Sequence, residues 1–314
     1  MVALCADPAG AAVYRRGMDE RRSVVVIGAG LAGLTAARAL RDAGVDVVVH
    51  EARDRVGGRT LTQDVHGAAV DLGAQWIGPA QHRMHALARR YGLATFETFT
   101  EGKAVVVDGA DVTAYAGTVP LLGPVQLARM GAALVKLRTL SFASDRGRAI
   151  TDDALEDTLA AWLGDGSARR VVDQAIRVIF GEEPTAVPLD WCAAYAAAAG
   201  GDLLDLAAIE GGAQQTRLVG GTQAVSVALA EGLDVVLERP VGRVARDADG
   251  VTVTSLDMAH TVRADRVIIA VPRPAAVLEH DPPMPEPVRR VSAGGRMGAT
   301  TKVVAVYDSP FWRA

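Results

Sequence analysis

The chain has 314 residues, of which 50% are hydrophobic and 22% are charged, and its formal net charge at pH 7 is -4. This length suits about two domains, each with enough apolar residues to bury a core. The nearly balanced charge excludes the strongly basic surface that a nucleic-acid or anionic-membrane partner requires. The two cysteines, Cys5 and Cys192, have no metal-ligand spacing, so we expect no metal site and a reducing, cytoplasmic compartment.

The N-terminal residues do not have the pattern of a targeting segment. Residues 1–17 have a short apolar start broken by Asp7, without a basic stretch ahead of an apolar core, so we expect a loose extension. Met18 then opens the first domain. Because no stretch of the sequence reaches the roughly 18 strongly apolar residues of a membrane-spanning helix, we expect no membrane span.

The first strong motif is a glycine pattern that follows a β-branched run at residues 24–27. A helical stretch follows it up to Gly44, and a second apolar strand at 45–49 leads to Glu51. In such a unit the glycines allow a tight turn, close approach of a pyrophosphate and helix packing, while the acid accepts ribose hydroxyls. Glu51 disfavours NADP, but FAD and NAD both remain open. The GxGxxG pattern comprises Gly28, Ala29, Gly30, Leu31 and Gly33.

The ten residues from Glu51 to Thr60, EARDRVGGRT, separate these two cofactors. Together with the preceding glycine pattern they resemble the N-terminal signature of the flavin-containing amine oxidase family. In that family an acidic residue, an arginine and a Gly-Gly-Arg sequence follow the dinucleotide motif directly. The resemblance implies FAD as the cofactor.

The residues of this stretch have distinct expected roles. Gly57 and Gly58 would let the backbone pass close to the phosphates and the ribityl chain. Arg53 and Arg59 would supply positive charge as paired hydrogen bonds. We expect Arg55 to be a surface residue.

Two further segments resemble the same family. The sequence VDLGAQWIGPAQHRM, residues 70–84, is similar to the segment that brings backbone to the flavin ring. The valine of the sequence ERPV, here Val241, matches the residue whose backbone contacts the adenine. The resemblance implies four flavin neighbours in the first segment, which are Gly73, Ala74, Gln75 and Trp76.

Residues 97–215 have the composition of a separate, largely helical domain. Thr151 with Asp152 and Asp153 predicts a helix start, and Ser167 is predicted to cap the next helix, which ends at Gly181. The apolar residues of the first of these helices recur at helical spacing and are Leu155, Leu159, Trp162 and Leu163.

Alternation near the C-terminus predicts a strand at residues 301–307, with Lys302 on the same face as Val304 and Val306. Only three lysines occur among the 33 basic residues, so a lysine at an inward-facing position is notable. It matches the family's lysine, which holds a water against flavin N5 and assists the reaction with oxygen. The resemblance therefore implies that Lys302 is the catalytic residue.

The resemblance covers about residues 22–313 and implies an α/β fold. We expect a Rossmann-like FAD-binding domain at 18–96 and 216–291, with an inserted, largely helical plus β substrate domain at 97–215 and 292–314. The family continues for roughly another domain beyond this point. We therefore expect a C-terminally truncated chain with an incomplete substrate domain.

The expected activity is FAD-dependent oxidative deamination of a primary amine or polyamine to an imine and aldehyde, with oxygen reduced to hydrogen peroxide. The expected partners are the amine and oxygen, without nucleic acid, and a homodimer is left open. An L-amino-acid oxidase or a flavin desaturase of the same superfamily is an alternative. A non-catalytic FAD-binding or unstable fragment is another.

Overall fold

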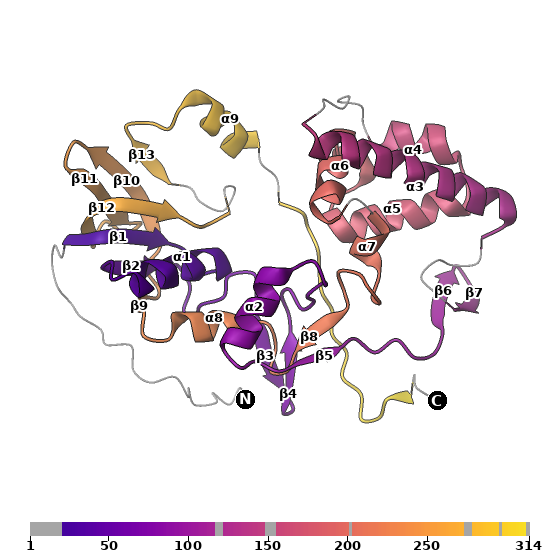
Figure 1. Ribbon diagram of the computed structural model, residues 1–314, viewed down its shortest axis with the longest axis horizontal. Coiled ribbons are helices and arrows are strands. Elements are labelled where there is room, and N and C mark those ends of the chain that lie inside the picture. The colour runs from indigo at the N-terminus through magenta and orange to yellow at the C-terminus, as the bar shows by residue number, and fades with distance from the viewer. Residues whose placement is uncertain are drawn as a thin grey trace. The chain divides into compact units, whose positions relative to one another are not determined.

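The computed structural model describes residues 21–116, 122–147, 155–200, 203–272, 278–294 and 297–311. The predicted extension at 1–17, the opening at Met18 and the helix start at residues 151–153 lie outside the described residues. The chain forms two compact units, one within residues 1–62 and 222–296 and the other within 63–221 and 297–314 (Figure 1). The predicted FAD and substrate domains have their boundaries at 96, 215 and 291, and this functional division stays a prediction.

The first unit is built on a seven-stranded sheet in the order β13-β10-β11-β12-β1-β2-β9. β12, β1, β2 and β9 are parallel neighbours, whereas β10, β11 and β12 form an antiparallel meander. The strands are β1 (Arg21–Ile27), β2 (Val47–His50), β9 (Asp234–Val236), β10 (Val241–Asp247), β11 (Gly250–Ser255), β12 (Thr261–Ile269) and β13 (Glu279–Asp281).

Three helices of the first unit are α1 (Leu31–Asp42), α8 (Gln223–Ala230) and α9 (Glu286–Gly294). α1 connects β1 to its parallel neighbour β2, which is the crossover that the sequence predicts. β-branched residues suit the sheet because they pack well on a pleated surface. One face of the sheet buries a core of Val25, Ile27, Val48, Val244, Val251, Val253 and Ala264. The predicted α/β fold with a Rossmann-like unit is confirmed.

The second unit combines helices with short two-stranded sheets, and its helices dominate residues 122–207 as predicted. The sheets pair β3 with β4, β5 with β8, and β6 with β7. The strands are β3 (Thr62–Val65), β4 (Ala68–Asp71), β5 (Thr95–Glu97), β6 (Ala104–Asp108), β7 (Asp111–Tyr115) and β8 (Thr216–Leu218). The helices are α2 (His82–Arg90), α3 (Pro124–Asp145), α4 (Leu155–Leu163), α5 (Ser167–Phe180), the 3-10 helix η1 (Pro184–Ala186), α6 (Leu189–Ala198) and α7 (Leu203–Ala207).

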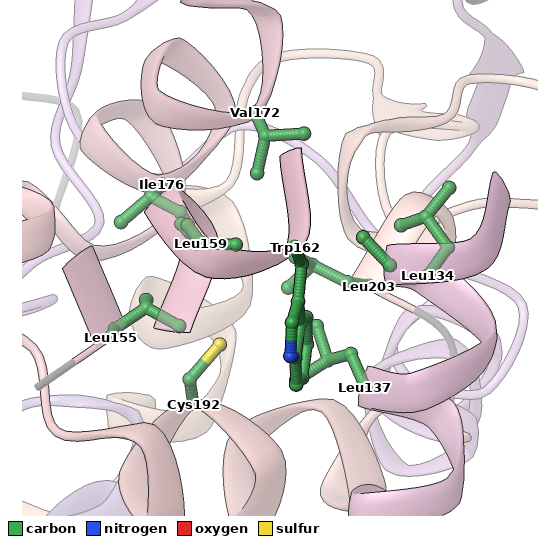
Figure 2. Close-up of a pocket in the computed structure, with 10 residues that line it drawn as sticks. Leu134, Leu137, Leu155, Leu159, Trp162, Val172, Ile176, Cys192 and Leu203 are labelled. Atoms are coloured by element: carbon green, nitrogen blue, oxygen red, sulfur yellow. The ribbon is translucent and has the colours of Figure 1, made fainter. Parts of the chain in front are cut away.

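Apolar residues from α3 to α7 form the core of the helical part. Leu155, Leu159 and Leu163 are buried there, as their helical spacing predicts, and Trp162 packs partly buried against it. Figure 2 shows this core around Trp162 and Cys192, where a cavity of about 10 Å³ remains. Such a space is at the lower limit for a single water and has an apolar lining, so it is a packing gap.

Two sequence-based predictions of local structure are wrong. Gly166 is the N-cap of α5, so Ser167 is already helical and no side chain caps this helix. Residues 301–307 form no strand, and Val304 and Val306 are 44% and 57% exposed. Alternation shows only which side chains share a face, whereas a strand also needs a hydrogen-bonded neighbour. The predicted helix end at Gly181 is confirmed, since Gly181 adopts a left-handed conformation with φ 64°.

Among the described helices, none combines the length and the apolar character that crossing a membrane requires.

Candidate functional site

The glycine loop after β1 contains two glycines that the fold itself requires. Gly28 has φ +103°, and a Cβ there would lie 2.7 Å from Cγ1 of Val271. A Cβ on Gly33 would lie only 2.0 Å from the carbonyl oxygen of Gly28. A larger residue at Gly33 would therefore push α1 away from the loop that follows β1, and one at Gly28 would press against Ala270 and Val271 after β12.

Gly30 has a different surrounding. It is the N-cap of α1 with φ -79°, and a Cβ there would have no neighbour closer than the Cα of Gly58 at 4.0 Å. No side chain caps α1 and its first turn has no acidic residue, so its first N–H groups lack side-chain acceptors. This open backbone surface at a helix N-terminus fits a pyrophosphate group.

The glycine pair at 57–58 lies directly against this loop. The N–H of Gly57 donates to the carbonyl of Ala29 at 2.8 Å, and Gly57 forms a parallel bridge with Gly30. A Cβ on Gly58 would lie 3.3 Å from the Cα of Gly30. Two segments that the family signature places in succession therefore form one continuous backbone surface.

Glu51 ties these segments together. Its side chain is buried, with Oε2 accepting the Ala29 N–H at 2.7 Å and Oε1 accepting the Arg53 N–H at 3.0 Å. Each carboxylate oxygen can accept more than one hydrogen bond, so acceptor positions remain for a ribose hydroxyl.

The three arginines of the signature differ in position. Arg53 is exposed and donates from Nη1 to the carbonyl of Gly58 at 3.2 Å, and Arg59 is exposed as well. The prediction that Arg55 lies on the surface is wrong. Arg55 is half-buried because its guanidinium, with several donors in one plane, meets carbonyls that converge inside this turn. These carbonyls belong to Val56, Gly58 and Thr60.

One residue far away in sequence, Gln223, helps to complete the turn, and the sequence analysis missed it. Gln223 accepts the Thr62 N–H at 2.9 Å and donates to the Val56 carbonyl at 2.9 Å. Thr60 donates from Oγ1 to the Gly57 carbonyl at 2.9 Å. A glutamine 161 residues away gives no sequence signal for this contact.

His50, which directly precedes Glu51, was also missed. It is 5% exposed, and its Nδ1 has no hydrogen-bond partner among the described residues. Burial lowers the pKa of His50 to about 4, and the positive charges of Arg239 and Arg22 act in the same direction. The imidazole is therefore neutral at pH 7.

The segment before β10 is joined to the same turn. The N–H of Arg239 donates to the carbonyl of Glu51 at 2.7 Å, and Val241, half-buried, begins β10 opposite Ser255. The contact of the Val241 backbone with an adenine stays a prediction.

A second group of predicted site residues lies in the other unit. Gly73, Ala74, Gln75 and Trp76 follow β4, and Trp76 is 39% exposed. The Nζ of Lys302 donates to the carbonyls of Asp71 and Gly73 at 3.1 and 2.6 Å. It also donates to Oε1 of Gln75 at 2.8 Å. The structure thus brings Lys302 together with the segment that the resemblance singles out.

Charges around Lys302 act in opposite directions on its pKa. Burial of the ammonium lowers the pKa of Lys302, the nearby carboxylate of Asp71 raises it, and Arg217 lowers it. The Asp71 side chain is buried and lies 3.9 Å from Nη2 of Arg217.

Comparisons with known proteins agree with the resemblance. A family model described as flavin containing amine oxidoreductase matches residues 31–314. A putative flavin-containing monoamine oxidase of Mycobacterium tuberculosis is 38% identical over 304 residues, which are 93% of this chain and 66% of that protein. Putrescine oxidase of Kocuria rosea is 35% identical over 315 residues, which are 93% of this chain and 66% of that protein.

A solved structure of putrescine oxidase bound to putrescine is also similar, with a TM-score of 0.85 and 32% identity over 94% of this chain and 68% of that one. The chain therefore spans about two thirds of the length of the curated relatives it matches. The family match confirms the predicted flavin cofactor. The chain belongs to the flavin-containing amine oxidoreductase family.

Proposed function

We propose that this chain carries the FAD-binding and lysine-bearing part of an oxidase that deaminates a primary amine or polyamine. The amine would become an imine and then an aldehyde, and oxygen would become hydrogen peroxide. The observation that carries this proposal is the joined backbone surface of Gly30 and Gly58, which Glu51 ties together, at the N-terminus of α1. The names of the relatives support the amine as substrate.

The described residues of the first unit fit the dinucleotide part of FAD. The uncapped N–H groups of α1 would bind the pyrophosphate, and the exposed Arg53 and Arg59 would neutralise its charge. Glu51 would accept a ribose hydroxyl, and the backbone of Val241 would contact the adenine. Leu31 begins the helix and offers its N–H beside that of Gly30, whereas the N–H of Ala29 is donated to Glu51.

Bound FAD supplies the redox chemistry, whereas the protein binds and orients the reactants. Backbone and side chains of residues 73–76 would face the flavin ring. Lys302 holds a positive charge at Nζ, which is hydrogen-bonded to this segment. A fixed charge there would hold a water and stabilise the negative charge that develops on oxygen as it is reduced.

The proposal also includes oxygen as the electron acceptor and a cytoplasmic location. The cytoplasmic location is supported by cysteine usage, because Cys192 is a free, buried thiol.

The first test measures flavin binding and peroxide. After incubation with FAD and extensive dialysis, we expect the purified chain to keep a visible flavin absorbance. Fusion to the C-terminal third of the Mycobacterium tuberculosis relative should give peroxide, in a peroxidase-coupled assay, with putrescine or tyramine and none with L-amino acids. Loss of all flavin on dialysis would contradict the cofactor role, and peroxide from L-amino acids alone would contradict the substrate class.

A further inference from the structure

The ammonium group of Lys302 is held by three hydrogen bonds to one short segment. An ammonium has three N–H donors, and the acceptors at residues 71–75 match that number. Although Lys302 is exposed as a residue, its Nζ thus has a partner for each donor. A water or an oxygen-derived anion can bind Nζ through a hydrogen bond only when one of these acceptors gives way.

The three acceptors differ in how easily they can move. Two are backbone carbonyls, and the first belongs to Asp71, the last residue of β4, whose own side chain is buried. Moving these carbonyls requires moving the chain. The third acceptor is the terminal amide oxygen of the half-buried Gln75, which can turn away by rotation about side-chain bonds.

The side chain that accepts a hydrogen bond from Lys302 is the neutral amide of Gln75, although the carboxylate of Asp71 is nearby. Asp71 contributes its carbonyl to Lys302, while its carboxylate lies 3.9 Å from Arg217. Among the described residues, Gln75 is therefore the side chain that hydrogen-bonds Lys302 directly. Its substitution removes an acceptor from the ammonium without breaking an ion pair or changing a backbone group.

We propose that Gln75 is a positioning residue for Lys302, whose amide oxygen fixes the ammonium and gives way when Lys302 takes a water or oxygen-derived anion. The inference rests on the proposed role of Lys302 in the reaction with oxygen. It assigns to the Gln75 side chain a task separate from that of a flavin neighbour. The task is carried out on Lys302, through the hydrogen bond of 2.8 Å between its Nζ and Oε1 of Gln75.

Nuclear magnetic resonance of the flavin-free chain can test this contact. The sequence contains three lysines, Lys103, Lys136 and Lys302, so selective lysine labelling with ¹³C and ¹⁵N gives three side-chain Nζ signals. Lys302→Arg assigns the signal of interest. A pH titration of each signal then reports the pKa of each ammonium.

We expect opposite effects from two substitutions. Gln75→Met keeps the length but removes the acceptor, so the pKa of Lys302 should fall below that of the parent. Gln75→Glu places a carboxylate beside the ammonium, so the same pKa should rise above the parent value. At any one pH, the Nζ signals of Lys103 and Lys136 should have the same positions in the spectra of all three proteins.

Gln81→Met is the matched control. Oε1 of Gln81 also accepts one hydrogen bond, from the Gly78 N–H at 3.2 Å, in the same unit. This variant should leave the Lys302 signal where it is in the parent. If Gln75→Met does not fold, Gln75→Asn keeps the amide but shortens its reach and should lower the pKa in the same direction.

An unchanged Lys302 signal in the Met, Asn and Glu variants would overturn the proposal. So would a shift in Gln81→Met equal to that in Gln75→Met, since it would reflect general disturbance of the segment. If the chain does not bind FAD, the proposed function is contradicted, but the titration of Lys302 still tests the role of Gln75. If flavin binds and peroxide is released but the pKa of Lys302 does not change in the Gln75 variants, only the role of Gln75 is contradicted.

Discussion

Glu51 and Lys302 are charged residues held mainly by backbone groups. Glu51 accepts the N–H groups of Ala29 and Arg53, and Lys302 donates to the carbonyls of Asp71 and Gly73. Removing one partner of such a bond leaves a polar backbone group unpaired, at about 1–3 kcal/mol when the group is buried. Substitutions at these residues therefore change local structure together with chemistry, and conservative variants separate the two effects better than alanine.

His50 gives a prediction for stability against pH. Its pKa is about 4 in the folded chain and 6.5 in the unfolded chain, so the unfolded state takes up the proton first as pH falls. The free energy of unfolding should be unaffected by His50 above pH 6.5 and should decrease progressively down to pH about 4. The shift corresponds to about 3 kcal/mol in total.

Urea unfolding at a series of pH values measures this effect. His50→Leu should have a shallower decrease between pH 6.5 and about 4 than the parent. His82→Gln, at an exposed position on α2, is the control and should follow the parent. Parallel curves for His50→Leu and the parent would show that the imidazole is protonated in the folded chain as readily as in the unfolded one.

The loop from β1 to α1 shows how one motif combines two different demands. Gly28 and Gly33 are required by packing, because a Cβ at either would meet atoms at 2.7 Å or closer. Gly30 has open space instead, so the fold does not explain its lack of a side chain. The proposed role of Gly30 accounts for this, because a side chain there would hinder the approach of a pyrophosphate to the N-terminus of α1.

Alanine at Gly30 should therefore affect mainly FAD retention, whereas alanine at Gly33 should affect mainly stability. The free energy of unfolding of Gly30→Ala should be within about 1 kcal/mol of the parent value, because φ -79° suits alanine. Its methyl group should nevertheless weaken FAD retention by about tenfold or more. Gly33→Ala should lose about 3 kcal/mol or more of stability, because its methyl group would overlap the Gly28 carbonyl.

Urea denaturation and flavin content after dialysis distinguish the two variants. If Gly30→Ala keeps the flavin content of the parent, the proposed role of Gly30 in binding the cofactor is wrong. A fully stable Gly33→Ala protein would contradict the close packing of α1 on the loop.

The described chain contains two units with separate hydrophobic cores. The first unit buries the valine-rich face of its sheet, and the second buries leucines of α3 to α7. The predicted site residues divide between the units, with the glycine loops and Glu51 in the first and Lys302 with Gln75 in the second. Each group has its own internal hydrogen bonds, so each can be probed by its own set of variants.

The helical core offers a prediction for the stability of the second unit. Leu159 is 4% exposed beside the small cavity, so Leu159→Ala should lower the free energy of unfolding by about 2–5 kcal/mol. Val135→Ala, at a position that is 66% exposed on α3, should change it by less than about 0.5 kcal/mol. Urea denaturation followed by tryptophan fluorescence compares them, and equal effects would contradict the packing of this core.

The order of strand, glycine loop, helix, strand and acid at residues 21–51 could be predicted from the sequence because each step is local. β-branched runs, glycine spacing and the acid after β2 act over a few residues, and the structure has β1, α1 and β2 there. The family and the flavin cofactor followed from the same stretch. Lys302 could be singled out by its rarity and its match to the family.

Contacts between distant segments were decided only by the tertiary structure. Arg55 is half-buried because three carbonyls converge on it, and Gln223 joins the same turn from another helix. Lys302 reaches Gln75 across 227 residues without the strand that alternation predicts. A sequence pattern shows which side chains of a segment share a face, but the partner that satisfies a polar group is set by long-range packing.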